Sequence, residues 1–520
     1  MHISLLRLLT AAVAGAALNL AFAPFTAWYV APLTLAVLAL TTRRASIGGA
    51  FSAGLIFGLG FFLPLLWWST ISVGAFVPWI ALSVLQALYV AFFTAIRQAT
   101  LRARWAERFC APLIDGLGSA ALWVALEALR ARWPFGGFAW GLLGYSQVDG
   151  PLGRLAAYGS TTLVGGAVVL VAILLARVIH APQRGAGRYL ARSLALVTAL
   201  ALPVAAGLVP LDTRPEAGSL RVGIVQGNVP RPPLPDWRDQ ARAVTNNHRE
   251  GTHRLIAAEG PVDLVVWPES SADIDPRTDP GVAAMVEDAV ATAGVPLMVG
   301  SQEFREHTRT NEHLIYVPTD EGATLIDFYR KQHPVPFGEY VPYRDFFRRL
   351  STQVDRITHD MVAGDEPGLV HIPWEGRDLP LGDVICFEIA FEDLVRESVS
   401  LGAQALIVPI NNASFGTSFE SAQQTQIARF RAVEHGRAVA QASTMGISAL
   451  IDPRGRVLSH TGLWESAHLV ADLPLRTSLT VADRLGAAPP IAAALSALVW
   501  IGMSLAQGGR RADARDHSDV

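Results

Sequence analysis

The chain has a single lysine, two cysteines and little net charge. The low cysteine count and the low net charge each exclude a class of protein. Lys331 is the only lysine among 42 basic residues. Two cysteines, Cys110 and Cys386, are too few for a disulfide framework. They are not expected to pair, since Cys110 lies in an arginine-rich turn beside an apolar segment and Cys386 in a distant polar region. A formal net charge of −3 gives no electrostatic basis for binding nucleic acid.

The single lysine lies in the stretch "FYRKQHPVPFGEYVP", residues 328–342, and has two possible explanations. One is drift toward arginine in a GC-rich genome, which leaves an occasional lysine by chance. The other is that this position needs a compact ammonium, which a planar guanidinium cannot imitate. Taken alone, the stretch does not decide between them.

Apolar residues, in contrast, are abundant, at 51% of the 520 residues, against 17% charged residues. Apolar stretches of membrane-spanning length fill the first 209 residues, and one more lies near the end of the chain. The expected spans are 3–22, 28–42, 47–72, 75–96, 112–130, 157–179, 189–209 and 489–508. The first run lacks a strongly charged start and a second span follows at once, so we expect it to be retained rather than cleaved. This pattern predicts an α-helical membrane bundle of about eight spans.

Arginine distribution predicts how this bundle is oriented. Arginines cluster at 43–44, 97–108, 177–188 and in the tail 509–520, whereas the short loops 23–27 and 72–78 have none. The exception is segment 131–156, which holds Arg132 and Arg154. The positive-inside rule then places both termini in the cytoplasm and the large polar region outside.

Segment 133–154, "WPFGGFAWGLLGYSQVDGPLGR", is rich in glycine and aromatic residues and is expected on the outer side. It is either an aromatic belt at the membrane interface or a wall of a lipid-access site. The sequence leaves both readings open.

The expected domains are transmembrane helices within 1–210, with the outer loop 131–156, and then a polar domain at 218–473. A last helix at 487–508 and a cytoplasmic tail at 509–520 follow. In the polar domain, short β-rich runs alternate with amphipathic stretches, which is typical of a layered α/β domain. Catalytic groups in such domains tend to lie just past strand ends.

Three of the β-rich runs end in residues that together can carry acyl transfer. Glu269 ends "VVWPE", Lys331 ends "LIDFYRK" and Cys386 lies near the end of "GDVICFE". A thiol needs a base to remove its proton, and a nearby ammonium stabilises negative charge on sulfur or on the attacked carbonyl oxygen. A hydrogen-bond donor that points at the developing oxyanion stabilises the transition state by roughly 3–4 kcal/mol. Each residue alone has an ordinary structural explanation; their coincidence at strand ends favours catalysis.

These motifs resemble the nitrilase superfamily, whose members use a Glu–Lys–Cys triad on an α-β-β-α sandwich. More closely, the chain resembles the apolipoprotein N-acyltransferases, the membrane-embedded branch of that superfamily. The resemblance covers nearly the whole chain. The matching motifs are "QGNVP", "WPES", "KQHPVPFGEYVP", "CFE", "RFRAVEHGR" and, in the membrane half, "GYSQVDGPLG".

The resemblance implies a role for each matching residue. Cys386 would be the nucleophile, Glu269 the proton acceptor, and Lys331 would stabilise the tetrahedral intermediate together with the backbone N–H of Phe387. The supporting positions are Glu339 and Glu388, with Trp237 on a mobile loop over the substrate entrance. The resemblance implies no metal or cofactor.

The chain departs from the family pattern at two places. Phe387 replaces a tyrosine, and "NNASFG", 411–416, stands where many relatives have Asn-Asp-Ala-Trp-Phe-Gly. These departures concern substrate contacts rather than the triad.

The implied reaction is ping-pong. A phospholipid, typically phosphatidylethanolamine, gives an acyl chain to Cys386 as a thioester, and the N-terminal amine of a diacylglyceryl-cysteine on a bacterial apolipoprotein then accepts it. The implied location is the bacterial plasma (inner) membrane, with the catalytic domain on the extracytoplasmic, periplasmic face. Two alternatives remain: a membrane-anchored amidase or thiol lipase that hydrolyses its acyl-enzyme, and a catalytically inactive transport or assembly scaffold.

Overall fold

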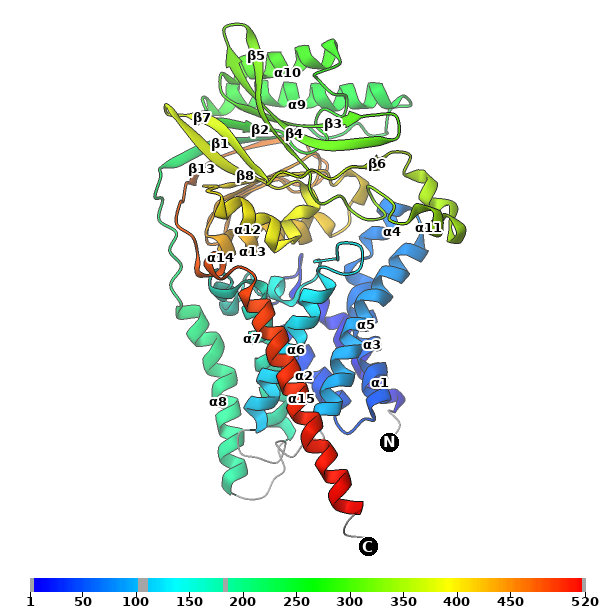
Figure 1. Ribbon diagram of the computed structural model, residues 1–520. Coiled ribbons are helices and arrows are strands. Elements are labelled where there is room, and N and C mark those ends of the chain that lie inside the picture. The colour runs from blue at the N-terminus through cyan, green and yellow to red at the C-terminus, as the bar shows by residue number, and fades with distance from the viewer. Residues whose placement is uncertain (1–3, 102–110, 181–185, 517–520) are drawn as a thin grey trace. The chain divides into compact units, whose positions relative to one another are not determined.

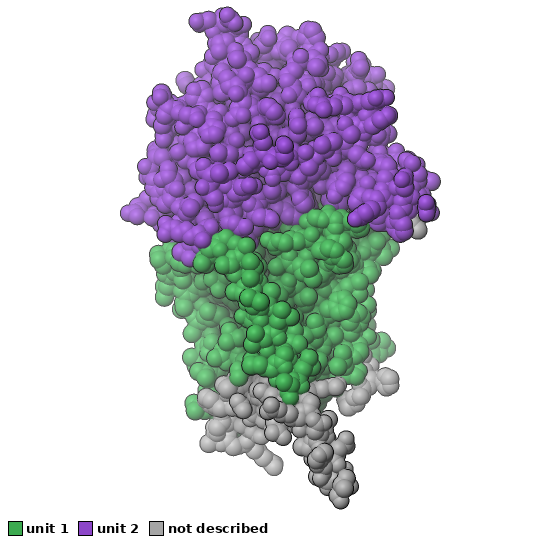
Figure 2. All heavy atoms as spheres, viewed as in Figure 1, with its two compact units in different colours: residues 1–210, 485–520 green, residues 211–484 purple. Residues whose placement is uncertain are grey.

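The computed structural model describes residues 4–101, 111–180 and 186–516. Cys110 lies outside these residues. The chain divides into two compact units, one of Met1–Pro210 with Leu485–Val520 and the other of Leu211–Arg484 (Figure 2).

The first unit is built of helices, labelled in Figure 1. They are α1 (Leu5–Leu18), η1 (Asn19–Ala21), α2 (Val30–Thr42), α3 (Ile47–Leu65), α4 (Trp68–Val73), α5 (Phe76–Thr100), α6 (Ala111–Arg130), η3 (Leu143–Gln147), η4 (Pro151–Leu155), α7 (Ala156–His180), α8 (Ala186–Leu208) and α15 (Ala488–Asp516). Within the described ranges, six helices are long and apolar enough to cross a membrane. The helices over the first two expected spans, α1 and α2, have only 14 and 13 residues, so eight crossings require both of these shorter helices to cross as well.

The expected span 47–72 is interrupted. Helix α3 ends at Leu65, one residue after Pro64, and α4 starts separately at Trp68. The polypeptide turns between Leu65 and Trp68 instead of continuing as one long helix.

Arginines from several helices gather at one end of this unit. Arg97 of α5 and Arg177 of α7 both form ion pairs with the buried Asp115 of α6, at 2.6 and 2.8 Å. Arg7 of α1 donates to the carbonyl of Arg43, just after α2, at 3.2 Å. The start of α1 and the end of α15 also lie at the same side of the unit (Figure 1).

Segment 133–154 folds back into the helical unit. The buried Arg130 guanidinium donates to the backbone carbonyls of Phe138, Trp140 and Gly141 at 3.1, 2.8 and 2.9 Å. The side chains of Trp140 and Tyr145 are both 1% exposed. These two aromatic residues are therefore part of the packed core, not of a belt on the surface.

The second unit contains two β-sheets. The first has the strand order β13-β1-β2-β3-β4-β5, with β6 paired to β4, and the second has the order β12-β11-β10-β9-β8-β7. In the first sheet the strands are β1 (Ser219–Gln226), β2 (Leu264–Val266), β3 (Leu297–Phe304), β4 (Thr308–Thr319), β5 (Gly322–Arg330), β6 (Asp360–Met361) and β13 (Ala467–Pro474). In the second they are β7 (Leu369–Trp374), β8 (Arg377–Asp383), β9 (Leu406–Ile410), β10 (Val439–Ser443), β11 (Ala449–Ile451) and β12 (Val457–His460). The central strands β1, β2 and β3 are parallel, as are β8, β9 and β10.

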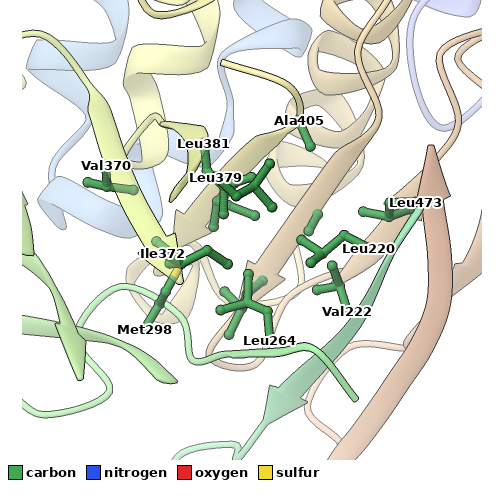
Figure 3. Packing of buried hydrophobic residues seen from close by; sticks show 14 of the residues in the cluster. Leu220, Val222, Leu264, Met298, Val370, Ile372, Leu379, Leu381, Ala405 and Leu473 are labelled. Atoms are coloured by element: carbon green, nitrogen blue, oxygen red, sulfur yellow. The ribbon is translucent and has the colours of Figure 1, made fainter. Parts of the chain in front are cut away.

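The main hydrophobic core of this unit draws on both sheets. Leu220, Val222 and Leu264 of the first sheet belong to the same buried cluster as Ile372 and Leu381 of the second (Figure 3). A separate cluster packs the first sheet against helices α9 (Trp237–Glu259) and α10 (Pro280–Ala293). The second sheet contacts α12 (Glu392–Ser400) and α13 (Glu420–His435). The remaining short elements are α11 (Arg344–Leu350), η5 (Thr352–Arg356), η6 (Cys386–Ala390), η7 (Ala413–Phe415) and α14 (Val481–Leu485).

Truncating the core between the sheets should destabilise the second unit. Leu381 is fully buried in that cluster, so Leu381→Ala leaves a cavity and should lower the free energy of unfolding by about 2–5 kcal/mol. The measurement is denaturant unfolding of the purified protein followed by tryptophan fluorescence. The matched control is Leu401→Ala, because Leu401 is 53% exposed; its cost should stay below about 0.5 kcal/mol. Equal effects of the two substitutions would contradict this assignment of the core.

Candidate active site

Lys331 follows strand β5, and its side chain is fully buried. Its Nζ donates to Glu339 at 2.6 Å and lies 3.4 Å from a carboxylate oxygen of Glu269. The second oxygen of Glu339 accepts the backbone N–H of Val335 at 2.7 Å, which closes the loop after Lys331. Burial alone would lower the pKa of Lys331, but Glu339 and Glu269 together raise it above its usual value. Lys331 is therefore a charged ammonium fixed between two carboxylates. This geometry suits a compact ammonium rather than the planar guanidinium of an arginine.

Glu269 follows β2 and is almost completely buried. One carboxylate oxygen accepts the side-chain N–H of Asn311 at 2.6 Å, and the other accepts the backbone N–H of Asn411 at 2.8 Å. The segment before Glu269 lies directly against β3 at Gly300, where a Cβ atom would come within 2.3 Å of the Pro268 carbonyl oxygen. Glycine at 300 therefore permits the close approach that places Glu269.

Cys386 begins the short turn η6 and has a φ of +57°. This left-handed conformation costs a residue with a side chain of the order of 1–3 kcal/mol, so neighbouring contacts must hold it. The residue is partly exposed, yet the surrounding protein removes water from the thiol, which raises its pKa. The charge on Glu269 raises that pKa further, and the charge on Lys331 opposes the rise. The resting thiol is therefore neutral, and its proton must leave as it reacts.

Glu388 holds the turn that carries Cys386. One of its oxygens accepts the backbone N–H of Ile385 at 2.8 Å. The other accepts the backbone N–H groups of Gln332 and His333 at 2.7 and 2.9 Å. Burial raises the pKa of Glu388 to about 7. This carboxyl group thus ties the turn at Cys386 to the segment that follows β5.

A buried pair beneath the site connects the two sheets. His313 on β4 and Asp383 at the end of β8 are both fully buried, with 2.6 Å between His313 Nδ1 and an Asp383 oxygen. The other ring nitrogen of His313 lies 3.2 Å from the carbonyl oxygen of Trp267. Burial raises the pKa of Asp383, and the neighbouring His313 counters this. The pair therefore joins the strand end before Glu269 to the strand end before Cys386.

Trp237 and Phe387 lie in different settings. Trp237 is the first residue of helix α9 and is 56% exposed, whereas the sequence-based expectation placed it on a loop. Its ring packs near that of Phe304, with 6.4 Å between centroids. Phe387 is buried, and its ring meets Phe391 edge-on at 5.4 Å.

Sequence reasoning missed several polar residues of this site. Asn311, on strand β4, donates to Glu269, and Glu420 is a buried carboxyl group on α13. Burial raises the pKa of Glu420 to about 8; a hydrogen bond from Asn412 counters the shift and the charge on Glu269 adds to it. Asn411 and Asn412 belong to "NNASFG", the stretch that differs from the family pattern. That difference was the only feature of the sequence that drew attention to this part of the site. Asn311 and Glu420 lie in polar stretches with no motif that would mark them as part of a site.

Among the residues that the structure describes, no group of three or more His, Cys, Asp or Glu side chains could hold a metal ion.

Two family models match this chain, one in each unit. Residues 221–481 match the family model of carbon-nitrogen hydrolases. Residues 14–174 match the model of the apolipoprotein N-acyltransferase N-terminal domain. The predicted combination of membrane helices with a nitrilase-type α/β domain is thereby confirmed.

Relatives over the whole length identify the family. An apolipoprotein N-acyltransferase of Azotobacter vinelandii is 35% identical over 508 residues, covering 95% of this chain and 94% of that protein. One of Mycolicibacterium smegmatis is also 35% identical, covering 96% of this chain and 84% of that protein. The chain belongs to the apolipoprotein N-acyltransferase family. A solved amidase from Nesterenkonia sp. is 19% identical with a TM-score of 0.35, over 50% of this chain and 92% of that one.

The buried carboxyl group of Glu420 predicts a pH-dependent stability. Its pKa is about 8 in the folded protein against an ordinary value of 4.5, so the folded state binds this proton more tightly than the unfolded state. The stabilisation is present below about pH 4.5 and is lost as the pH rises to about 8. Glu420→Gln should therefore raise the Tm at pH 9, by about 2–4 °C for each kcal/mol recovered. At pH 4.5 it should leave the Tm close to that of the parent.

The measurement is thermal unfolding from pH 4.5 to pH 9. Glu397→Gln is the control, because Glu397 is an exposed residue on the neighbouring helix α12 and should not change the pH profile. A Glu420→Gln protein with the same pH profile as the parent would show that folding does not raise the pKa of Glu420.

Proposed function

We propose that this chain transfers an acyl chain from a membrane phospholipid, through a thioester on Cys386, to the N-terminal amine of the diacylglyceryl-cysteine of bacterial apolipoproteins. Membership of the family supports the overall activity. The observation that carries the mechanism is the buried Lys331 ammonium held by Glu269 and Glu339, with both Lys331 and Glu269 acting electrostatically on the Cys386 thiol.

In the first half-reaction, Glu269 takes the thiol proton as the Cys386 sulfur attacks the ester carbonyl carbon of the phospholipid. The carbonyl oxygen becomes negatively charged in the tetrahedral intermediate. The Lys331 ammonium and the backbone N–H of Phe387 stabilise this charge, each aimed donor contributing roughly 3–4 kcal/mol. The C–O bond of the ester then breaks, the lysophospholipid leaves with the proton from Glu269, and the acyl group remains on sulfur.

In the second half-reaction, the uncharged amine of the acceptor attacks the thioester carbonyl carbon. Glu269 takes a proton from the attacking nitrogen, the C–S bond breaks and the sulfur is protonated again. The product is an amide, and the enzyme returns to its resting state. One carboxylate thus serves as base in both halves, while Glu339 and Glu388 hold Lys331 and the Cys386 turn in position.

The arginine distribution supports a membrane orientation for the proposal. Arg43, Arg97 and Arg177 lie at the ends of α2, α5 and α7, the last two joined through Asp115. By the positive-inside rule this end is cytoplasmic. With eight crossings both termini are cytoplasmic, and residues 218–473 form a catalytic domain on the extracytoplasmic face of the inner membrane. A donor such as phosphatidylethanolamine and the exposed Trp237 at the substrate entrance fit this arrangement.

The decisive experiment is mass spectrometry of the Cys386 peptide after the purified protein meets phosphatidylethanolamine with one defined acyl chain. The peptide should gain the mass of that acyl chain, and hydroxylamine should remove it. The adduct should persist with little free fatty acid until a diacylglyceryl-cysteine peptide is added. Steady fatty-acid release without acceptor would favour a hydrolase instead. Amide formation by Cys386→Ala would exclude the thioester route.

Exchanging the only lysine tests its electrostatic role. Lys331→Arg should slow acylation of Cys386 by about 100-fold or more, because a guanidinium does not fit between Glu269 and Glu339 and loses aim at the oxyanion. The control is Arg330→Lys, a change of the opposite kind one residue earlier, at a partly exposed position paired with Glu312. The rate is measured from the early appearance of the acylated peptide. A normal acylation rate in Lys331→Arg would contradict the electrostatic role of Lys331. The single lysine would then be explained by the drift of a GC-rich genome toward arginine.

A further inference from the structure

Helix α13 brings a side-chain amide to the reactive sulfur. Gln424 is fully buried, and its Nε2 lies 3.7 Å from the Sγ of Cys386, a hydrogen-bonding distance for sulfur. This glutamine is not part of the proposed Glu269–Lys331–Cys386 triad. Its neighbour one turn earlier on the helix is the buried Glu420.

Asn412 determines which end of the Gln424 amide faces the sulfur. The Asn412 amide nitrogen donates to the side-chain oxygen of Gln424 at 2.9 Å and to a carboxyl oxygen of Glu420 at 2.8 Å. Because the oxygen of Gln424 already accepts this hydrogen bond, the amide nitrogen is the end that points at Cys386. The reversed amide would oppose two N–H donors in a buried place, which is costly.

Asn412 is itself fixed by two hydroxyl groups. Its side-chain oxygen accepts from Ser443 at 2.7 Å and from Ser421 at 3.2 Å. A Cβ atom at Gly446 would lie 2.1 Å from this oxygen, so a glycine there leaves the necessary room. Every hydrogen bond in this buried chain therefore runs in one direction, from the hydroxyls through Asn412 and Gln424 to the sulfur.

A hydrogen-bond donor at the Cys386 sulfur would favour its ionised form, which the surroundings disfavour. Burial and the charge on Glu269 both raise the pKa of the Cys386 thiol, and Lys331, which opposes them, is already shared between two carboxylates. A hydrogen bond from a neutral N–H strengthens as its acceptor becomes charged. It therefore stabilises the sulfur most when negative charge develops on it.

We propose that Gln424 is a further catalytic residue, whose side-chain N–H donates to the Cys386 sulfur as the thioester forms and as it breaks. Asn412 is the positioning residue that aims it. The assignment rests on the proposed role of Cys386 as nucleophile. In the first half-reaction the N–H stabilises the sulfur while its proton passes to Glu269. In the second it stabilises the departing sulfur before reprotonation.

The test measures the thiol directly, without substrate. Gln424→Met keeps the size of the side chain and removes its donor. In a Cys110→Ser background, so that one thiol is labelled, the rate of alkylation by iodoacetamide is measured against pH on the full-length protein in detergent. The midpoint of the profile should rise by about one pH unit, which means about tenfold less thiolate at any pH below it. Gln424→Glu, which places a carboxylate at the sulfur, should raise the midpoint further.

The matched control is Gln441→Met. Gln441 is also fully buried, but its amide nitrogen donates to Thr425 and to the Ile447 carbonyl, both at 2.8 Å. This variant should unfold more easily than the parent and keep the parent midpoint. A purely structural role of Gln424 would make the two variants alike.

The outcomes separate this inference from the proposed function. An unchanged midpoint in Gln424→Met, with a normal acyl-thioester in the parent, overturns the hydrogen bond and leaves the function intact. A raised midpoint in a protein whose parent forms no acyl-thioester supports the hydrogen bond and rejects the function. If Gln424→Met does not fold, Gln424→Leu gives the same measurement, and an unchanged midpoint there overturns the proposal equally.

Discussion

The site depends on a single positive charge that protein surrounds completely. Removing an ammonium from water costs several kcal/mol unless oppositely charged groups and hydrogen bonds compensate. Glu339 and Glu269 supply that compensation for Lys331 from two separate segments of the chain. Because the ammonium needs both carboxylates, it fixes the loop after β5 and the strand end after β2 together. Burial of the Cys386 thiol, together with the charges on Glu269 and Glu339, raises its pKa against the opposing charge on Lys331, which is why the thiol rests in its neutral form.

The two packed sheets supply the rigidity that this arrangement requires. Glu269 and Lys331 follow strands of the first sheet, and Cys386 follows a strand of the second. The His313–Asp383 pair crosses from one sheet to the other, and Glu388 links the Cys386 turn back to the residues after Lys331. Transfer of a group between reacting atoms is sensitive to displacements of about 1 Å. Buried polar contacts between the sheets therefore serve geometry as well as stability.

Sequence patterns predicted those parts of the site whose signal is local. β-Rich runs that end in Glu269, Lys331 and Cys386 mark strand ends, and the only lysine stands out by its rarity. Asn311 and Gln424 could not be found this way, because a polar residue on a strand or helix gives no sign of whether it faces inward. Trp140 and Tyr145 were open to a surface interpretation for the same reason. The Arg130 guanidinium holds the backbone carbonyls of Trp140 and Gly141 inside the helical unit, a contact that sequence spacing does not encode.

The left-handed backbone at Cys386 has an evolutionary consequence. Glycine adopts such a conformation without steric conflict, and asparagine tolerates it better than most residues. A descendant gene released from selection for chemistry would therefore gain folding stability by exchanging this cysteine for either of them. A cysteine at this position, where its side chain strains the main chain, is therefore better explained by the proposed chemistry than by folding stability.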